Sequence, residues 1–212
     1  MMPSDGTVLG NDAGKLVKAP APAPLHVMVD LETLGTEAGC AVVAIGAVHF
    51  GLEGPGPVIR STFERRISVA SNARAGLFID GKTLEWWLSQ DAEAITATFG
   101  GERVDVWSAL KDFTRWVREL GAPDVPLLLW AKPPSFDQTI LEAACQHVGV
   151  PTPWSHRDWR DLRTLEFLAA QVGFDMPDTV ARVKHSALED ASAQAYNAAK
   201  RILYVRSRAP QS

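Results

Sequence analysis

Residues 25–32 read Leu25-His26-Val27-Met28-Val29-Asp30-Leu31-Glu32, and this segment is the most informative one for the fold. Its valines and other apolar residues predict a β-strand, which Thr33 and Gly35 bring to an end. Since alternate side chains of a strand share one face, Asp30 and Glu32 should point the same way, ~6–7 Å apart. Two charges at the end of an apolar strand are costly unless water or a cation neutralises them. The stretch therefore predicts either a solvated strand end or a cation site.

Two further strands follow closely. Residues 41–50 are almost entirely apolar, as expected for the interior of a sheet. Residues 51–57 have the composition of a turn, and a third strand is predicted at about 58–67. Three strands joined by short turns indicate an antiparallel meander.

The rest of the chain combines helical patterns with one more strand. Helices are predicted at 83–88, 93–99 and 104–120, the last with apolar residues at helical spacing. A buried strand at 126–131 precedes three further helices, at about 135–148, 161–172 and 186–207. This order predicts a ribonuclease-H-like α/β fold, in which a mixed β-sheet of three antiparallel strands plus parallel strands is flanked by helices.

Length and composition fit a single domain. The chain has 212 residues, enough for one α/β domain with a sizeable core. We expect this domain at 25–207, between a disordered Ala/Pro-rich tail at 1–24 and a short tail at 208–212. The formal net charge of −4 argues against a sequence-independent duplex binder, which usually carries a basic excess. An enzyme that holds one strand end through metal ions needs no such excess.

The two cysteines and the hydropathy indicate the compartment. Cys40 and Cys145 form no metal-binding or redox motif, so we expect two buried thiols in a reducing cytosol. No apolar run reaches the ~18 residues of a membrane span, and the N-terminus has no apolar core of signal-peptide type. A cytoplasmic location without membrane contact is therefore expected.

Acidic residues recur at two helix starts. Ser135-Phe136-Asp137-Gln138 fits a capping box with Ser135 as N-cap, which places Asp137 in a first helical turn just after a strand. On its own, Asp137 could equally be an ordinary first-turn acid favoured by the helix dipole.

The last helix begins in the same manner. Ser186 and Glu189 form a second capping box in His185-Ser186-Ala187-Leu188-Glu189-Asp190. His185 then lies just outside the helix and Asp190 one turn inside. A lone histidine at such a place is more often a surface residue, but its spacing to Asp190 favours a role in catalysis.

Convergence of Asp30, Glu32, Asp137 and Asp190 would require cations, because mutual repulsion would otherwise protonate some of the acids. Hard oxygen ligands select Mg²⁺ or Mn²⁺ rather than zinc. Two such ions, ~3.5–4 Å apart, can activate a water and stabilise the leaving oxygen of a phosphodiester. A histidine side chain can accept the proton of that water, which makes His185 the candidate general base.

These motifs together resemble a known family. Asp30-Leu31-Glu32, Phe136-Asp137 and His185-x4-Asp190, in this order and separation, resemble the DEDDh exonucleases, which include ribonuclease T and polymerase proofreading subunits. The likeness covers about 25–205. A closer likeness, to exonuclease-VIII-like and exonuclease A proteins of phages and prophages, is carried by residues 29–35, 83–87 and 160–164.

The resemblance implies a metal-dependent 3′→5′ exonuclease that releases nucleoside 5′-monophosphates from DNA or RNA, with a single strand as the expected substrate. It implies that Asp30 bridges two ions, that Glu32 and Asp190 complete the shell of one, and that Asp137 contacts metal through water. It assigns the general base to His185. Related enzymes are often dimers, which leaves a homodimer open, and a phage or prophage origin would place the protein in the bacterial host cytoplasm.

Further residues are expected to contact the substrate. One of Trp86 and Trp87 should be core and the other available for base stacking, because adjacent helical residues point about 100° apart. Arg163 could contact phosphate or pair with Asp161. The remaining expected contacts are Thr33, Leu34 and Phe136.

One segment departs from the family. Relatives often have Gly and Asn before the Phe-Asp pair, whereas this chain has Lys132-Pro133-Pro134-Ser135, whose prolines remove backbone donors. The departure favours the main alternative, a catalytically silent nucleic-acid-binding module of the same fold in phage replication or recombination. A third interpretation, paired glycosidase acids, needs no metal, so chelation separates it from the exonuclease.

Overall fold

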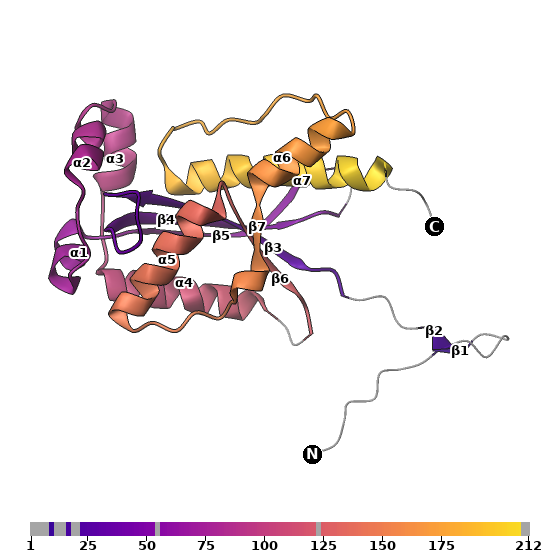
Figure 1. The fold of residues 1–212 in the computed structure, drawn as a ribbon, viewed down its shortest axis with the longest axis horizontal. Helices are drawn as coiled ribbons and strands as arrows, with labels where there is room; N and C mark the ends of the chain where they lie inside the picture. Colours follow the sequence, from indigo (N-terminus) through magenta and orange to yellow (C-terminus); the bar gives the residue numbers. More distant parts are fainter. Residues whose placement is uncertain (1–8, 11–15, 18–21, 54–55, 122–123, 209–212) are drawn as a thin grey trace, which may run out of the picture.

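Figure 1 presents the computed structural model, which describes residues 9–10, 16–17, 22–53, 56–121 and 124–208. Most of the tail predicted at 1–24 lies outside the described residues. Within it, two short strands, β1 (Leu9–Gly10) and β2 (Leu16–Val17), pair antiparallel with each other.

A five-stranded mixed sheet forms the centre of the molecule, in the order β5-β4-β3-β6-β7. The first three strands in sequence, β3 (Leu25–Thr33), β4 (Val42–Gly51) and β5 (Val58–Arg66), are antiparallel neighbours. β6 (Leu127–Ala131) joins β3 in parallel, and β7 (Trp159–Asp161) joins β6 in parallel. The predicted antiparallel meander and the mixed sheet are therefore confirmed. Strand β7 was not predicted, because three residues carry no usable periodicity.

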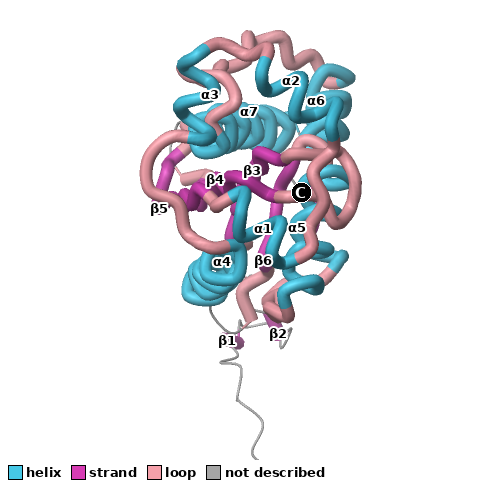
Figure 2. Tube along the Cα trace, turned by 90° about the vertical axis from the view of Figure 1, so that its left-hand side faces the viewer, coloured by secondary structure: helices cyan, strands magenta, loops and turns pink. Residues whose placement is uncertain are grey.

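Helices cover both faces of the sheet. In Figure 2, α7 (Ala187–Arg208) lies on one side of the strands and α4 (Val106–Leu120) on the other. α5 (Pro134–Val148) packs on the α4 side, and α6 (Leu162–Gln171) packs beside α7. The remaining helices are α1 (Val69–Ala75), α2 (Gly81–Leu88), α3 (Ala92–Phe99) and the 3-10 turn η1 (His156–Asp158).

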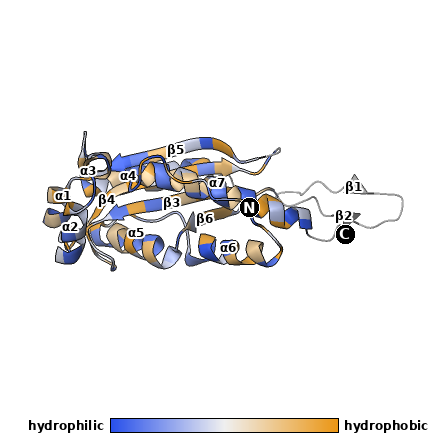
Figure 3. Cartoon of the chain, turned by 90° about the horizontal axis from the view of Figure 1, so that it is seen from above, coloured by the Kyte–Doolittle hydropathy of each residue, from blue (hydrophilic) through white to orange (hydrophobic). Residues whose placement is uncertain are grey.

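The two faces of β3 bury different side chains. Val27, Val29 and Leu31 belong to the core cluster that includes apolar residues of α4 and α5. Met28 belongs to the opposite cluster, where it meets four alanines of α7. Alternation then directs Asp30 and Glu32 to the α7 side as well. Figure 3 shows hydrophilic residues at the end of β3, near α1 and α2, and along much of the edge strand β5.

The starts of α4 and α5 differ from the prediction, for reasons that the structure shows. α4 begins after Asp105, whose side chain accepts the Ser108 N–H at 3.0 Å, so it starts two residues later than predicted. The capping box predicted for α5 is wrong: Pro133 is the N-cap, Pro134 opens the helix, and no side chain caps it. A proline needs no partner for an N–H that it lacks, so the helix can begin there without Ser135.

Helices α2 and α3 lie together beyond the end of β3 in Figure 1. Each is started by an aspartate: Asp80 accepts the Thr83 N–H and Asp91 accepts the Ala94 N–H, both at 2.8 Å. Such caps fix where a short helix begins. Within the described part of the chain, no helix is both long and apolar enough to cross a membrane.

Candidate active site

The site begins at the end of β3, where Asp30 and Glu32 face α7. In the sheet register Asp30 lies opposite Gly46 of β4. A Cβ at Gly46 would lie 2.1 Å from the carbonyl carbon of Ala187, so only glycine lets the first turn of α7 rest on the sheet at this point. The close approach brings Asp190, in that first turn, to the two acids of β3.

Three carboxylates meet as a result. Ligand atoms of Asp30, Glu32 and Asp190 all lie within 4.8 Å of one another. Asp137 approaches the same region from the start of α5, but it is not one of the three acids whose ligand atoms meet within this distance. Its side chain is buried, and its Oδ1 accepts the N–H of Leu31 at 3.1 Å. Asp137 thus ties α5 to β3 between the two acids of the strand.

The acids crowd one another in a poorly solvated space. Burial raises the pKa of Asp30 well above its usual value, and the charges of Asp137, Glu32 and Asp190 raise it further. Burial raises the pKa of Glu32 to about 8 and that of Asp137 to about 7. Burial also raises the pKa of Asp190, against the opposing charge of His185. Positive charge is what this cluster needs to ionise at neutral pH.

The donor set fits a divalent cation. Carboxylate oxygens are hard ligands, which Mg²⁺ and Mn²⁺ prefer, and the three of Asp30, Glu32 and Asp190 are within reach of a common ion. A bound dication would also offset the repulsion that holds their pKa values high.

His185 is held by helices α2 and α3. Its φ of 59° is left-handed, which a non-glycine residue rarely adopts without support. The hydroxyl of Thr98, in α3, donates to the His185 carbonyl at 2.6 Å. The imidazole meets the rings of Trp86 and Trp87 edge-on, with centroids 5.0 and 5.9 Å away. The contact of Thr98 with His185 could not be predicted from a local pattern, because it joins residues 87 positions apart in the chain.

The two tryptophans divide as predicted. Trp87 is buried, and its Nε1–H donates to the Thr33 carbonyl at 2.9 Å. Trp86 leaves 43% of its surface exposed. The buried ring thereby connects α2 to the end of β3, while the exposed ring remains available to a ligand.

A cavity of about 870 Å³ adjoins the three converging carboxylates, His185 and the two tryptophans, whereas Asp137 is not among its lining residues. Of the predicted site residues, it is lined by Asp30, Glu32, Thr33, Trp86, Trp87, Phe136, His185 and Asp190. The sequence did not indicate Phe78, Lys82 and Gln194, which also line it.

Two expected substrate contacts lie elsewhere. Leu34 is only 1% exposed and packs in the core on the α4 side, so its side chain cannot touch a ligand in the cavity. Arg163 is exposed at the start of α6 and does not line the cavity. Its predicted ion pair with Asp161 does not form either. Asp161 instead caps α6, accepting the Arg163 backbone N–H at 2.9 Å.

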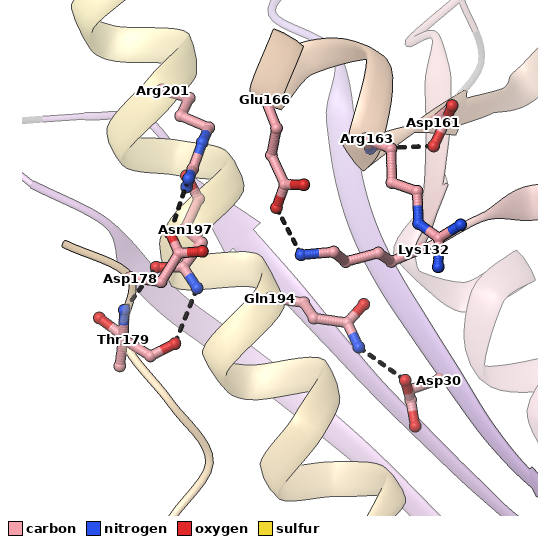
Figure 4. A network of polar contacts seen from close by, with 10 residues as sticks. All are labelled: Asp30, Lys132, Asp161, Arg163, Glu166, Asp178, Thr179, Gln194, Asn197 and Arg201. Atoms are coloured by element: carbon pink, nitrogen blue, oxygen red, sulfur yellow. Dashed lines mark hydrogen bonds and ion pairs between the residues drawn. The ribbon is translucent and has the colours of Figure 1, made fainter. Parts of the chain in front are cut away.

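One polar contact joins α7 to Asp30 of the acid cluster, and further polar contacts lie along α6 and α7, as Figure 4 shows. Gln194 Nε2 donates to Asp30 Oδ1 at 2.6 Å, and Lys132 Nζ pairs with Glu166 of α6 at 2.5 Å. Further along α7, the Asn197 amide makes two bonds of 2.8 Å to the backbone of Thr179. This clamp fixes the segment that leads to His185.

Known structures share the fold. The chain superposes on cell-death related nuclease 4 (CRN-4) with a TM-score of 0.59 at 13% identity, over 85% of this chain and 64% of that one. It superposes on the nuclease domain of 3′hExo, a DEDDh family member bound to rAMP, with a TM-score of 0.56 at 15% identity, over 87% of this chain and 94% of that one. For Escherichia coli ExoI in a zinc-bound complex with single-stranded DNA, the TM-score is 0.55 at 15% identity, over 90% of this chain and 42% of that one. The chain thus spans less than two thirds of CRN-4 and of ExoI, and at these identities the likeness concerns the fold alone.

Sequence comparison identifies the family. No curated protein matches the chain significantly. A family model does match, over residues 25–202: the 3′-5′ exoribonuclease Rv2179c-like domain. That match takes in the whole five-stranded sheet, both acids of β3, and the helices that bring Asp137 and Asp190 to them. The chain therefore belongs to the family of Rv2179c-like 3′-5′ exoribonuclease domains.

Proposed function

We propose that this chain is a DEDDh-type nuclease that hydrolyses single-stranded RNA from its 3′ end, releasing nucleoside 5′-monophosphates. The observation that carries the proposal is the convergence of Asp30, Glu32 and Asp190 within 4.8 Å, in the cavity that also holds His185. The full set of four acids and one histidine argues against a catalytically silent module, which would not need to keep it.

Asp30, Glu32 and Asp190 would hold two divalent ions, Mg²⁺ or Mn²⁺, with Asp137 supporting them from the start of α5. When bound, the ions supply activation of a water molecule and stabilisation of the leaving oxygen. The His185 imidazole accepts the proton of the attacking water, and the carboxylate of Asp190 stabilises the imidazolium that forms. The contacts with Thr98, Trp86 and Trp87 hold the imidazole in place for this transfer.

The same cavity offers surfaces for a terminal nucleotide. The exposed face of Trp86 can stack on a base of any identity, and Phe136 and Thr33 line the space beside the acids. The family description supports RNA as the substrate. The rAMP bound to 3′hExo and the single-stranded DNA bound to ExoI support a strand end in this fold. Arg163 is proposed to contact a backbone phosphate outside the cavity.

Four expectations from the sequence stay predictions: one domain at 25–207, a phage or prophage origin, a cytoplasmic location and a homodimer.

A time course on end-labelled oligonucleotides tests the proposal. Single- and double-stranded RNA and DNA are incubated with Mg²⁺, with Mn²⁺ and with EDTA. We expect mononucleotides from the 3′ end of single-stranded RNA with either metal and none with EDTA. Asp30→Asn and His185→Gln should abolish this release. Asp175→Asn and His156→Gln, at exposed positions, should leave it unchanged.

Two outcomes would contradict the proposal. Equal activity of the wild type and Asp30→Asn would show that another site, or a contaminant, cleaves the RNA. Binding of the labelled strand without shortening, in either metal, would favour the catalytically silent binding module.

A further inference from the structure

Gln194 makes the shortest polar contact to the acid cluster from outside it. The residue lies one turn after Asp190 on α7, and it lines the same cavity. Its Nε2 donates to Oδ1 of Asp30 at 2.6 Å, across 164 residues of sequence (Figure 4). Among the described residues, no donor contacts the other oxygen of Asp30. The amide therefore restrains the orientation of one carboxylate that faces the site.

The other end of the same amide is unsatisfied. Gln194 Oε1 is buried and has no hydrogen-bond partner within the described part of the chain. A buried acceptor without a partner destabilises a fold, whereas a methionine of similar size would fill the same space without that cost. The hydrogen bond to Asp30 accounts for the NH2 group of this amide, but no contact among the described residues accounts for its oxygen. The unsatisfied oxygen instead points to a donor that arrives with the ligands of the cavity.

The neutrality of this donor matters. A cation beside Asp30 would cancel the negative charge that a metal ion requires. The nearby ammonium of Lys132 is bonded instead to Glu166, on α6, at 2.5 Å. Gln194 donates a hydrogen bond to Asp30 and leaves the charge of the carboxylate unchanged. Hydrogen-bond partners of this kind orient ligands and tune metal affinity in known metal sites.

We propose that Gln194 is a positioning residue for metal binding, which holds Oδ1 of Asp30 so that the other carboxylate oxygen faces the cation. Its Oε1 accepts a hydrogen bond from a water molecule of the loaded site. The inference rests on the proposed function, because it presupposes that Asp30 binds a metal.

Binding of Mn²⁺ to the full chain, measured by calorimetry without substrate, tests the inference. Gln194→Met removes the donor at nearly constant volume, and Gln194→Ala removes it without any added bulk should the first variant fold poorly. Both should bind Mn²⁺ about tenfold to a hundredfold more weakly than the wild type. Gln146→Met, at an exposed position of α5, is the matched control and should bind as the wild type does.

Metal rescue separates positioning from general damage. If Gln194 acts through metal affinity, raising the Mn²⁺ concentration should restore most of the RNA hydrolysis of Gln194→Met while KM for the oligonucleotide stays unchanged. A variant that is merely distorted would gain nothing from extra metal. Wild-type Mn²⁺ affinity in a folded Gln194→Met or Gln194→Ala protein would overturn the inference.

The Asp30→Asn variant shows which idea has failed. If Asp30→Asn loses Mn²⁺ binding while the Gln194 variants keep it, only the inference about Gln194 is wrong. If the wild type itself binds no Mn²⁺, the proposed function and this inference fail together.

Discussion

The two ends of β3 bury polar side chains on the same face, in opposite ways. Near the start of the strand, His26 is 4% exposed between the rings of Phe50 and Trp130, and its Nδ1 accepts the Trp130 Nε1–H at 3.1 Å. Near the other end, Asp30 is surrounded by three further acids. The fold supplies a partner for the histidine. For the carboxylates it supplies mostly like charge.

The pKa values of His26 and Asp30 show the same difference between the two ends of β3. Burial lowers the pKa of His26 to about 4, which keeps the ring neutral and able to accept its hydrogen bond. Burial and like charge raise the pKa of Asp30, which opposes the ionised form that a metal ion would need. A buried polar group that finds its partner inside the fold contributes to stability. A buried charge that does not find one marks a place where the partner comes from outside.

The largest expected effect comes from removing the charge of Asp30. Asp30→Asn should reduce RNA hydrolysis by about a thousandfold or more, since metal ions contribute several kcal/mol to such reactions. In metal-free buffer the same variant should be more stable than the wild type. Urea unfolding with and without Mg²⁺ measures both states, and Mg²⁺ should stabilise only the wild type.

The stability advantage of Asp30→Asn over the metal-free wild type should increase with pH. The pKa of Asp30 is higher in the folded protein than in the unfolded chain, so folding takes up a proton above the unfolded pKa. The metal-free wild type therefore loses stability relative to Asp30→Asn as pH rises above that value. If the difference in unfolding free energy between the wild type and Asp30→Asn stays constant with pH, Asp30 is well solvated and this prediction is wrong.

The histidine end should respond to pH in the opposite direction. Because the folded pKa of His26 is about 4 and the unfolded value is 6.5, its contribution is full above pH 6.5 and is lost as pH falls toward 4. The loss amounts to at most about 3 kcal/mol. His26→Gln keeps an acceptor for Trp130 but does not titrate in this range.

The difference in unfolding free energy between wild type and His26→Gln isolates this effect, because the carboxylates titrate in both proteins. The advantage of the wild type should shrink between pH 6.5 and 4.5 in urea unfolding. Parallel pH curves for the two proteins would contradict a neutral, buried His26.

A substitution at Gly46 should affect one end of β3 and spare the other. The Cβ of Gly46→Ala would collide with the backbone of Ala187 and displace the start of α7. Overpacking of this kind costs about 1–3 kcal/mol. A shift of Asp190 and His185 by ~1 Å should lower activity about a hundredfold. Gly56→Ala, where a Cβ meets nothing within 4 Å, is the control.

The position of His26 should be unchanged in Gly46→Ala, which NMR of the histidine ring can follow. Full activity of this variant would show that α7 need not contact the sheet so closely for the acids to converge.

The smallest effect is expected at Trp86. Loss of one stacking surface should cost about 1–3 kcal/mol of binding, so Trp86→Ala should raise KM for single-stranded RNA roughly tenfold. Trp107→Ala removes a similarly exposed ring on α4 and should change nothing. If both variants keep the wild-type KM, the terminal base does not stack on Trp86.

Some residues of the site could be predicted from the sequence, and others could not. Strand alternation, helix starts and the family resemblance predict that Asp30, Glu32 and Asp190 lie together near His185, and the structure does bring these residues to one cavity. Their catalytic roles stay predictions. Leu34 was misassigned to the substrate, since a residue next to a site can still point into the core. The N-cap at Ser135 was also wrong, because the prolines before it offer another way to begin α5. Thr98 and Gln194 had no local signature at all.

Most strands and helices, the two faces of β3 and the acids that its motifs share with known exonucleases could be predicted from the sequence alone, although the short elements β7 and α1 could not. These features depend on residues close together in the chain, where periodicity and capping act. The three-dimensional packing was needed to show that α7 rests on Gly46, that Thr98 contacts the His185 carbonyl and that Gln194 contacts Asp30. Those contacts join residues 87 to 164 positions apart, and their existence depends on how whole layers pack rather than on any local preference.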